Sequence, residues 1–163
     1  MTPNLCFRLA LALTLLAGPM LPDTAWGQAA APEDDEAAVL EAEDRLLDGM
    51  RDRDGTLVDS AFHSHARLAR TGVEDAGILW VVVEGVDRFV TTVGAGGEPL
   101  NEVHFDPEVR VDGDLAHVWT YYRFYSGDEL SRCGHNSIQL VRTSKGWKIL
   151  SLAYTDRMEE CDP

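Results

Sequence analysis

The sequence predicts an α+β fold, with helices early in the chain and a sheet of long antiparallel strands after them. Three observations indicate this fold. Apolar residues recur at helical spacing before residue 63, strand-like segments dominate after residue 100, and turn residues such as Asp112-Gly113 separate those segments. Because long antiparallel strands must hide one face, and the helices are the only available cover, we expect the helices to pack against the sheet.

Residues 1–27 have the layout of a signal peptide. Arg8 is the only charge ahead of an apolar run at 9–17, and small residues follow that run. The run is too short to cross a bilayer as a helix, and no later apolar stretch is long enough to do so. We expect cleavage after Gly27 or within the alanines that follow, a flexible leader at 28–33, and a secreted or periplasmic product without membrane contact.

The chain is strongly acidic, with 28 acidic and 14 basic residues and a net charge of −14. Residues 1–27 contain one basic and one acidic residue, so the mature chain keeps the same net charge. It lacks the clustered lysine and arginine that bind phosphates, which argues against nucleic acids and anionic membranes as partners. The roughly 135 remaining residues suffice for one domain, which we place at 34–157, with a C-terminal tail at 158–163.

Export changes the meaning of the cysteines. Once Cys6 leaves with the signal peptide, Cys133 and Cys161 are the only thiols in an oxidising compartment. A disulfide between them is the default expectation, and it would tie the C-terminal tail to the sheet. The alternatives are a bridge between separate chains and a pair of free redox thiols, although the Cys-x-x-Cys spacing of redox sites is lacking.

The predicted helices come first. Residues 32–54 form a helix with acidic residues in its first turn and an apolar stripe on one face, made by Val39, Ala42, Leu46 and Met50. Asp54 is the predicted N-cap of a second, short helix that ends near His63. A third helix at 86–93 is followed by the glycine-rich segment 94–99, a plain loop, because it lies after a helix and before a strand, the reverse of the order in a dinucleotide site.

The predicted strands follow the turn signals. A short strand at 66–70 precedes the apolar run 78–83, which is typical of a strand covered on both faces. An antiparallel meander then occupies the remainder, with strands at 101–111, 115–125, 135–142 and 147–155. If the last turn has two residues, His135 lies opposite Tyr154, whereas a bulge would shift every partner by one residue.

The chain with these elements resembles the nuclear transport factor 2-like (NTF2-like) superfamily. The resemblance rests on residues 62–68, on 83–89 and above all on 110–156, and it covers nearly the whole mature chain. Cys133-Gly134 together with the segments QLVRT and GWKI is similar to the exported, lumazine-binding-like branch. The resemblance implies a cystatin-like cone, in which a strongly curved antiparallel sheet wraps around three helices. It also implies a pocket inside the cone and often a homodimer through the outer face of the sheet.

The strand at 115–125 carries aromatic residues on both faces. One face holds Trp119, Tyr121, Arg123 and Tyr125. If this face is concave, it offers aromatic walls, phenol hydroxyls and a guanidinium group to a small ligand. If it is convex, the same composition suits a dimer interface. On the next strand, His135, Ser137 and Gln139 make a polar row that is either solvated or the polar side of a pocket.

The candidate ligand-binding residues are Trp119, Tyr121, Arg123, His135 and Tyr154. Cones that resemble this chain include isomerases, dehydratases and polyketide cyclases as well as binders without activity, so the fold alone names no reaction. Their catalysis often relies on an Asp or His base opposite a Tyr or His donor. We expect Asp156 to be solvent exposed at the end of its strand, and we assign no catalytic residue.

No metal site or cofactor is expected, because His63-Ser64-His65 supplies only two possible ligands and a closed zinc site needs four. We expect an exported, non-catalytic domain that binds a small molecule or a partner and forms a homodimer. One alternative is a cofactor-free isomerase or polyketide cyclase-like enzyme that acts on a hydrophobic carbonyl compound; the other is a purely structural dimer module. An Asp or His opposite a Tyr inside the cone would favour the enzyme.

Overall fold

The computed structural model describes residues 32–74 and 77–162. Within these ranges the chain forms three helices and one six-stranded sheet, which confirms the predicted α+β fold. The helices are α1 (Pro32–Arg51), α2 (Gly55–Ala61) and α3 (Val86–Gly94). The predicted signal peptide and most of the predicted leader fall in residues 1–31, outside the described residues. Among the helices of the described part, none is both long and apolar enough to span a membrane.

The sheet contains strands β1 (Phe62–Val73), β2 (Leu79–Gly85), β3 (Leu100–Asp112), β4 (Leu115–Ser126), β5 (Glu129–Thr143) and β6 (Gly146–Thr155). Their order across the sheet is β2-β1-β6-β5-β4-β3. All neighbours are antiparallel, as predicted, except β1 and β6, which are parallel. Strands β2 to β5 and helix α3 lie between these two strands in the chain, so no tight turn fixes their relative direction.

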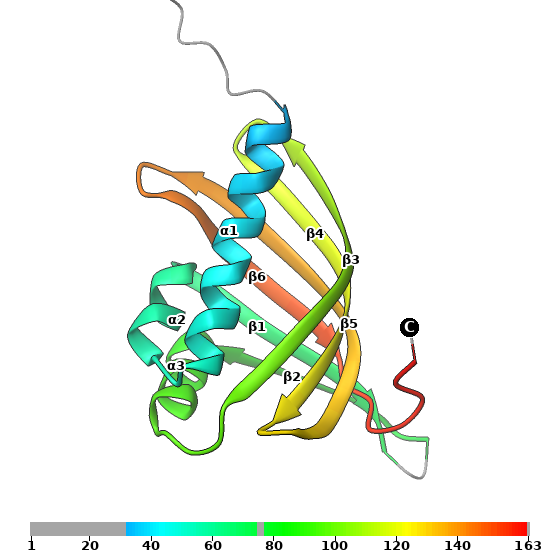
Figure 1. The fold of residues 1–163 in the computed structure, drawn as a ribbon. Coiled ribbons are helices and arrows are strands. Elements are labelled where there is room, and N and C mark those ends of the chain that lie inside the picture. The colour runs from blue at the N-terminus through cyan, green and yellow to red at the C-terminus, as the bar shows by residue number, and fades with distance from the viewer. Residues whose placement is uncertain (1–31, 75–76, 163) are drawn as a thin grey trace, which may run out of the picture.

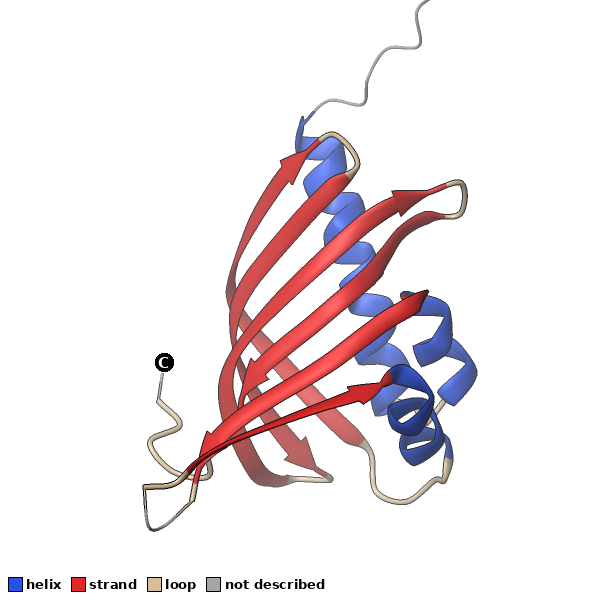
Figure 2. Ribbon diagram, turned by 180° about the vertical axis from the view of Figure 1, so that it is seen from behind, coloured by secondary structure: helices blue, strands red, loops and turns tan. Residues whose placement is uncertain are grey.

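The three helices lie on one side of the sheet. Figure 1 shows α1 running along the concave face with α2 and α3 near its C-terminal end, and Figure 2 shows the convex face free of helices. The predicted apolar stripe of α1 is buried, with Val39, Ala42, Leu46 and Met50 at most 4% exposed. It packs in one core with inward-facing residues of β4, β5 and β6, such as Val118, Ile138 and Ile149.

Helix α1 ends at Arg51 rather than at residue 54, because the chain turns sharply there. Arg53 has a left-handed backbone with φ of 56°. The carboxylate of Asp54 then accepts hydrogen bonds from the N–H groups of Thr56 and Leu57 and so caps α2, as predicted. A single tight turn therefore separates the two helices.

Strand β2 lies at the edge of the sheet, so the prediction that it is covered on both faces is wrong. Leu79, Val81 and Val83 are 76%, 69% and 65% exposed. A continuous apolar run does not distinguish a central strand from an edge strand. The edge position results from the topology, because β6 occupies the other side of β1.

Burial shows which face of β4 is concave. The residues on the helix side are at most 5% exposed: Ala116, Val118, Thr120, Tyr122 and Phe124. Since successive side chains of a strand point to opposite faces, Trp119, Tyr121 and Arg123 lie on the convex face. The alternative in which this aromatic face lines the inside of the cone is thereby ruled out.

A bulge in β6 sets the partners of β5. The pairing follows the two-residue turn as far as Leu140 opposite Ile149, but the register then skips Leu150. Tyr154 therefore lies opposite Asn136. The pairing of Tyr154 with His135, which was predicted for a turn without a bulge, does not occur. The shift places Asn136 and Tyr154 together on the concave face and leaves His135 on the convex face.

Candidate functional site

A cavity lies between the helices and the concave face of the sheet. Its volume is about 30 Å³, room for about two water molecules. Apolar side chains line much of it, among them Leu46, Met50, Leu68, Phe89, Ile138 and Leu152. The polar side chains that face it are Glu102, His104, Tyr122, Arg132, Asn136 and Tyr154.

Two carboxylates hold the imidazole ring of His104. Glu43 of α1 places Oε1 2.7 Å from Nδ1, and Glu102 of β3 places Oε1 2.7 Å from Nε2. All three side chains are largely removed from water, with exposed fractions of 3% for Glu43, 14% for Glu102 and 10% for His104. Glu102 and His104 share a face because they are two residues apart on one strand. The group links α1 to the sheet.

The environment keeps His104 protonated. Burial by itself lowers the pKa of His104, but the hydrogen bonds and negative charges of Glu102 and Glu43 outweigh burial and raise the pKa to about 10. Both ring nitrogens are then donors. At neutral pH the group is an imidazolium ion between two carboxylates.

Asn136 completes the arrangement around Glu102. Its side-chain Nδ2 donates to Glu102 Oε1 at 2.7 Å and lies 3.1 Å from His104 Nε2. Two donor nitrogens therefore share one carboxylate oxygen, which explains why they lie close to each other. Both hydrogen bonds end on Oε1, and Oε2 of Glu102 has no side-chain partner among residues 32–74 and 77–162.

Two tyrosines stand on the same face of the sheet. Their rings meet edge to face, with 6.1 Å between the centroids. The hydroxyl of Tyr122 donates to the carbonyl oxygen of Thr155 at 2.8 Å, whereas Tyr154 makes no such bond within the described ranges. Burial raises the pKa of Tyr122 and of Tyr154, and the charge of Glu102 raises both further. Both phenols therefore stay protonated at neutral pH and act as hydrogen-bond donors.

Gly134 allows Tyr122 to reach Thr155. The register places Gly134 on β5 opposite Tyr122, between β4 and β6. A Cβ atom at this position would lie 2.1 Å from the carbonyl oxygen of Thr155. Only glycine fits such a close approach, so the residue after Cys133 is fixed by packing around the site.

Of the five predicted ligand-binding residues, Tyr154 alone lines the cavity. Trp119, Tyr121 and His135 form an aromatic cluster on the convex face, in which His135 stacks on Trp119 with 5.1 Å between the ring centroids. Arg123 lies above the ring of Phe105 on that face, 5.3 Å from its centroid. The structure therefore separates residues that the sequence prediction grouped in one pocket.

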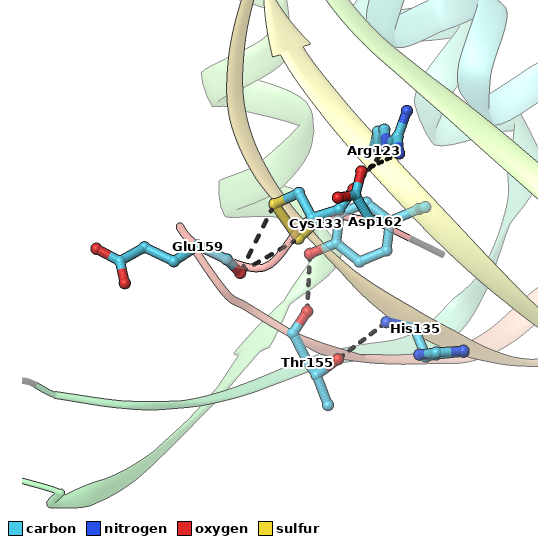
Figure 3. The surroundings of a disulfide bond; sticks show 8 residues. Arg123, Cys133, His135, Thr155, Glu159 and Asp162 are labelled. Carbon is cyan, nitrogen blue, oxygen red and sulfur yellow. Dashed lines mark hydrogen bonds and ion pairs between the residues drawn. A yellow bond between two sulfur atoms is a disulfide. The ribbon is translucent and has the colours of Figure 1, made fainter.

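The C-terminal tail covers part of the convex face (Figure 3). Cys133 and Cys161 form the predicted disulfide, with 2.15 Å between the sulfur atoms. Arg123 donates from Nε to the carbonyl oxygen of Cys161 at 2.8 Å and pairs with Asp162 at 3.3 Å.

The prediction of an exposed Asp156 is wrong, because its side chain is 10% exposed and lies 3.7 Å from Arg70.

A comparison with known protein families identifies the family of this chain. Residues 34–153 match the family model described as the SnoaL-like domain. The chain belongs to this family. No curated protein matches the chain.

Solved structures share the fold of this SnoaL-like domain. An NTF2-like protein of unknown function from Shewanella baltica OS155 is 16% identical with a TM-score of 0.64, covering 80% of this chain and 100% of that chain. A protein proposed to be a dehydratase of the NTF2-like family, from Streptomyces avermitilis, is 19% identical with a TM-score of 0.57, and the match covers 79% of this chain and 100% of that chain. A protein proposed to be an aromatic ring hydroxylase, from Novosphingobium aromaticivorans, is 21% identical with a TM-score of 0.61, and the match covers 79% of this chain and 93% of that chain. The superfamily resemblance is confirmed, and the lumazine-binding-like branch stays a prediction.

Sequence reasoning missed the polar centre of this SnoaL-like domain. Glu43 falls on the buried stripe of α1, three residues before Leu46 and four after Val39. A carboxylate on an otherwise apolar helix face is the signal that could have marked it, since buried carboxylates need partners. Glu102 and His104 are two residues apart and so lie on the same face of their strand, but the sequence did not indicate that this face was the concave one.

Proposed function

We propose that this SnoaL-like domain is an enzyme that moves a proton on a small carbonyl compound, as in an isomerisation or a dehydration, with protein side chains as the acid and base. The observation that carries the proposal is the cavity-facing carboxylate of Glu102. One of its oxygens is fixed by His104 and Asn136, and the other, which has no side-chain partner in the described part of the chain, is available to a ligand. A buried ion group in a cavity is a common mark of a catalytic site.

Each polar group has a defined task in the proposed reaction. Glu102 takes a proton from the carbon next to the carbonyl group. The electron pair of that C–H bond forms a C=C bond, and the π pair of the carbonyl group moves to its oxygen. The phenol of Tyr154 donates a hydrogen bond to the enolate oxygen that forms. In an isomerisation, Glu102 then returns the proton to another carbon of the enolate. In a dehydration, the enolate electrons form a C=C bond as the C–O bond of the neighbouring carbon breaks, and Glu102 gives its proton to the departing hydroxyl group, which leaves as water. His104 stays protonated throughout and fixes the carboxylate of Glu102.

The size and composition of the cavity limit the substrate. The open space holds about two water-sized groups, so only the reacting end of a molecule enters without rearrangement. A larger substrate must displace lining side chains, and Met50 is the most adaptable of them because its thioether chain is flexible and unbranched. The mostly apolar walls suit a carbonyl compound with a hydrocarbon skeleton.

Proton exchange into D₂O tests this proposal. The full chain is incubated with butanone, cyclohexanone or 4-oxopentanoate, and loss of the α-proton signals is followed by NMR. The substitution Glu102→Gln is expected to slow the exchange by roughly 10²- to 10⁴-fold. Glu108→Gln is the matched control, because it makes the same change on the same strand at a side chain that is 68% exposed. Equal rates for the wild type and Glu102→Gln with all three ketones would refute the proposal.

A second candidate function is ligand binding without catalysis, which was the expectation from the sequence. The observation in its favour is that carboxylates already occupy both nitrogens of His104, so the ring offers a ligand neither a free donor nor an acceptor. Crystallography of protein purified from its native host would test it. A molecule in the cavity together with no proton exchange would favour the binder over the enzyme.

We also propose that the convex face forms a homodimer. Trp119 is 43% exposed at the centre of its strand, and the adjoining aromatic and arginine side chains have the composition of an interface. Sedimentation equilibrium should give a dimer for the wild type and a monomer for Trp119→Glu. Leu130→Glu is the control, since Leu130 is 44% exposed near the end of the neighbouring strand. A wild-type monomer would contradict the interface.

Export is a further part of the proposed function. The Cys133–Cys161 disulfide supports it, because such bridges persist in oxidising compartments. We propose that residues 1–27 are removed, that 28–33 form a leader whose last two residues are the first of α1, that 34–157 form the domain and that 158–163 form its tail. The intact mass of the protein from its native host should correspond to a chain that begins near residue 28. A mass that includes residue 1 would contradict cleavage.

A further inference from the structure

Arg132 is a cation that lines the cavity and has no acidic partner among the described residues. The carbon at the centre of its guanidinium group lies 4.0 Å from the ring centroid of Phe124. Its Nε atom is buried, and no acceptor for it exists among residues 32–74 and 77–162. A buried donor without an acceptor is costly, so this nitrogen is suited to an acceptor that arrives with a ligand.

The other arginines that stack on aromatic rings make the contrast clear. Arg70, Arg123 and Arg142 lie over Trp80, Phe105 and Trp147. Each of them also pairs with a carboxylate: Arg70 with Asp156 at 3.7 Å, Arg123 with Asp162 at 3.3 Å and Arg142 with Asp35 at 2.8 Å. In the described part of the chain, Arg132 is the stacked arginine that lacks such a carboxylate, and it is the one that lines the cavity.

The register explains why Glu102 does not neutralise Arg132. Phe124 pairs with Glu102 on one side and with Arg132 on the other. The two charged residues are therefore separated by two strand spacings, about 10 Å between their Cα atoms, with an aromatic residue between them. Glu102 is engaged with His104 and Asn136 instead. A cation and a proton acceptor thus face one cavity from separate strands.

We infer that the ligand of this cavity carries a carboxylate, which pairs with the guanidinium group of Arg132 while the reacting carbon lies at Glu102. Because the open space holds about two water-sized groups, this ligand displaces lining side chains such as that of Met50 as it binds. The part of this inference that concerns the reacting carbon rests on the proposed proton transfer. A planar carboxylate matches the fork of guanidinium N–H groups. The positive charge of Arg132 acts on both tyrosines of the site, where it opposes the rise of their pKa. Short oxo acids, with a carbonyl group a few bonds from the carboxylate, have this chemistry.

Binding of a matched pair of compounds tests the inference without use of catalysis. The probes are 4-oxopentanoate and its amide, 4-oxopentanamide, which differ in charge but hardly in shape. Titration of the full chain, followed by NMR or calorimetry, is expected to show binding of the acid at least about tenfold tighter than binding of the amide. Equal affinities, or no saturable binding of the acid, would overturn the inference.

Two arginine variants locate the effect. Arg132→Gln should abolish the preference for the acid, and Arg132→Lys should restore part of it, because lysine keeps the charge without the fork. Arg123→Gln is the matched control, since it removes an arginine from an aromatic ring on the convex face and should keep the full preference. Thermal unfolding of each variant establishes that it is folded. A preference that survives in folded Arg132→Gln would overturn the assignment.

Glu102→Gln separates this inference from the proposed function. If both hold, this variant loses proton exchange and still prefers the acid over the amide. If the acid preference depends on Arg132 but Glu102→Gln exchanges protons like the wild type, the ligand class stands and the reaction does not. If exchange depends on Glu102 but acid and amide bind equally, the reaction stands and the ligand class does not.

Discussion

Strand β4 presents aromatic side chains on both faces of one sheet, but their surroundings differ. On the concave face, Tyr122 lies under the helices beside a buried group of charges. On the convex face, Trp119 is 43% exposed, and the C-terminal tail contacts the neighbouring Arg123. The ionised groups interact strongly where the helices exclude water, so it is the cover by helices, and not the aromatic content of the strand, that determines where such a group forms.

The largest expected effect concerns the pH dependence of the concave centre. The pKa of His104 is raised from 6.5 to about 10 in the folded protein. Its stabilising contribution is therefore complete below pH 6.5 and is lost as the pH rises through 10, which amounts to a loss on the order of 5 kcal/mol. Urea unfolding at several pH values measures this loss. The variant His104→Gln should show a much flatter profile over the same range.

His135, a histidine on the convex face, is the control for this prediction. His135 stacks on Trp119 at the surface of the sheet, and His135→Gln should keep the wild-type decline between pH 6.5 and 10. If His104→Gln and the wild type lose the same stability on that interval, the ion group does not hold its proton as the geometry indicates.

The next effect breaks the packing behind the concave face. Gly134→Ala places a Cβ atom against the carbonyl oxygen of Thr155, so the strands must shift, at a cost of about 4 kcal/mol in the free energy of unfolding. Gly85→Ala is the control, because nothing lies within 4 Å of the added Cβ atom. A Gly134→Ala protein as stable as Gly85→Ala would contradict the close approach.

The disulfide tests the convex face. It spans 28 residues of sequence, and closure of such a loop stabilises the folded chain by about 3.5 kcal/mol in the chain-entropy model. The double variant Cys133→Ala with Cys161→Ala should lose about this much in urea unfolding. Proton exchange at Glu102 should stay near the wild-type rate, because the tail lies on the other face. A large loss of exchange would show that the two faces are coupled.

The smallest effect comes from a matched pair of neighbouring tyrosines. Tyr122→Phe removes the hydrogen bond to Thr155 and should cost about 1 to 2 kcal/mol. Tyr121→Phe removes a hydroxyl that is buried without a hydrogen-bond partner in the described ranges, so its stability should be unchanged or slightly higher. Thermal unfolding of both variants compares the two faces directly. The reverse order would contradict the assignment of the hydroxyl contacts.

Local signals in the sequence predicted the fold well. The stripe from Val39 to Met50, the cap at Asp54 and the hairpin at Asp112-Gly113 each depend on residues close together in the chain, and each appears in the structure. The exposure of β2 was not predictable in this way. It depends on which strand pairs with the far side of β1, and that strand comes last in the sequence.

The site was less predictable because it depends on two non-local facts. The first is the bulge at Leu150, which exchanges His135 for Asn136 opposite Tyr154. The second is the packing of α1 across β3, which brings Glu43 to His104. A period of two residues identified the members of each face of β4, but nothing in the strand itself indicated which face the helices cover.

The parallel pairing of β1 with β6 has a consequence for folding. The strand nearest the C-terminus lies in the interior of the sheet, between one of the earliest strands and β5. The hairpin of β1 and β2 therefore cannot join the rest of the sheet until nearly the whole polypeptide is available. Pairings between such distant segments slow the search for the native topology. A truncation that removes the tail and β6 would therefore leave two sheet fragments that no strand joins, rather than a slightly smaller domain.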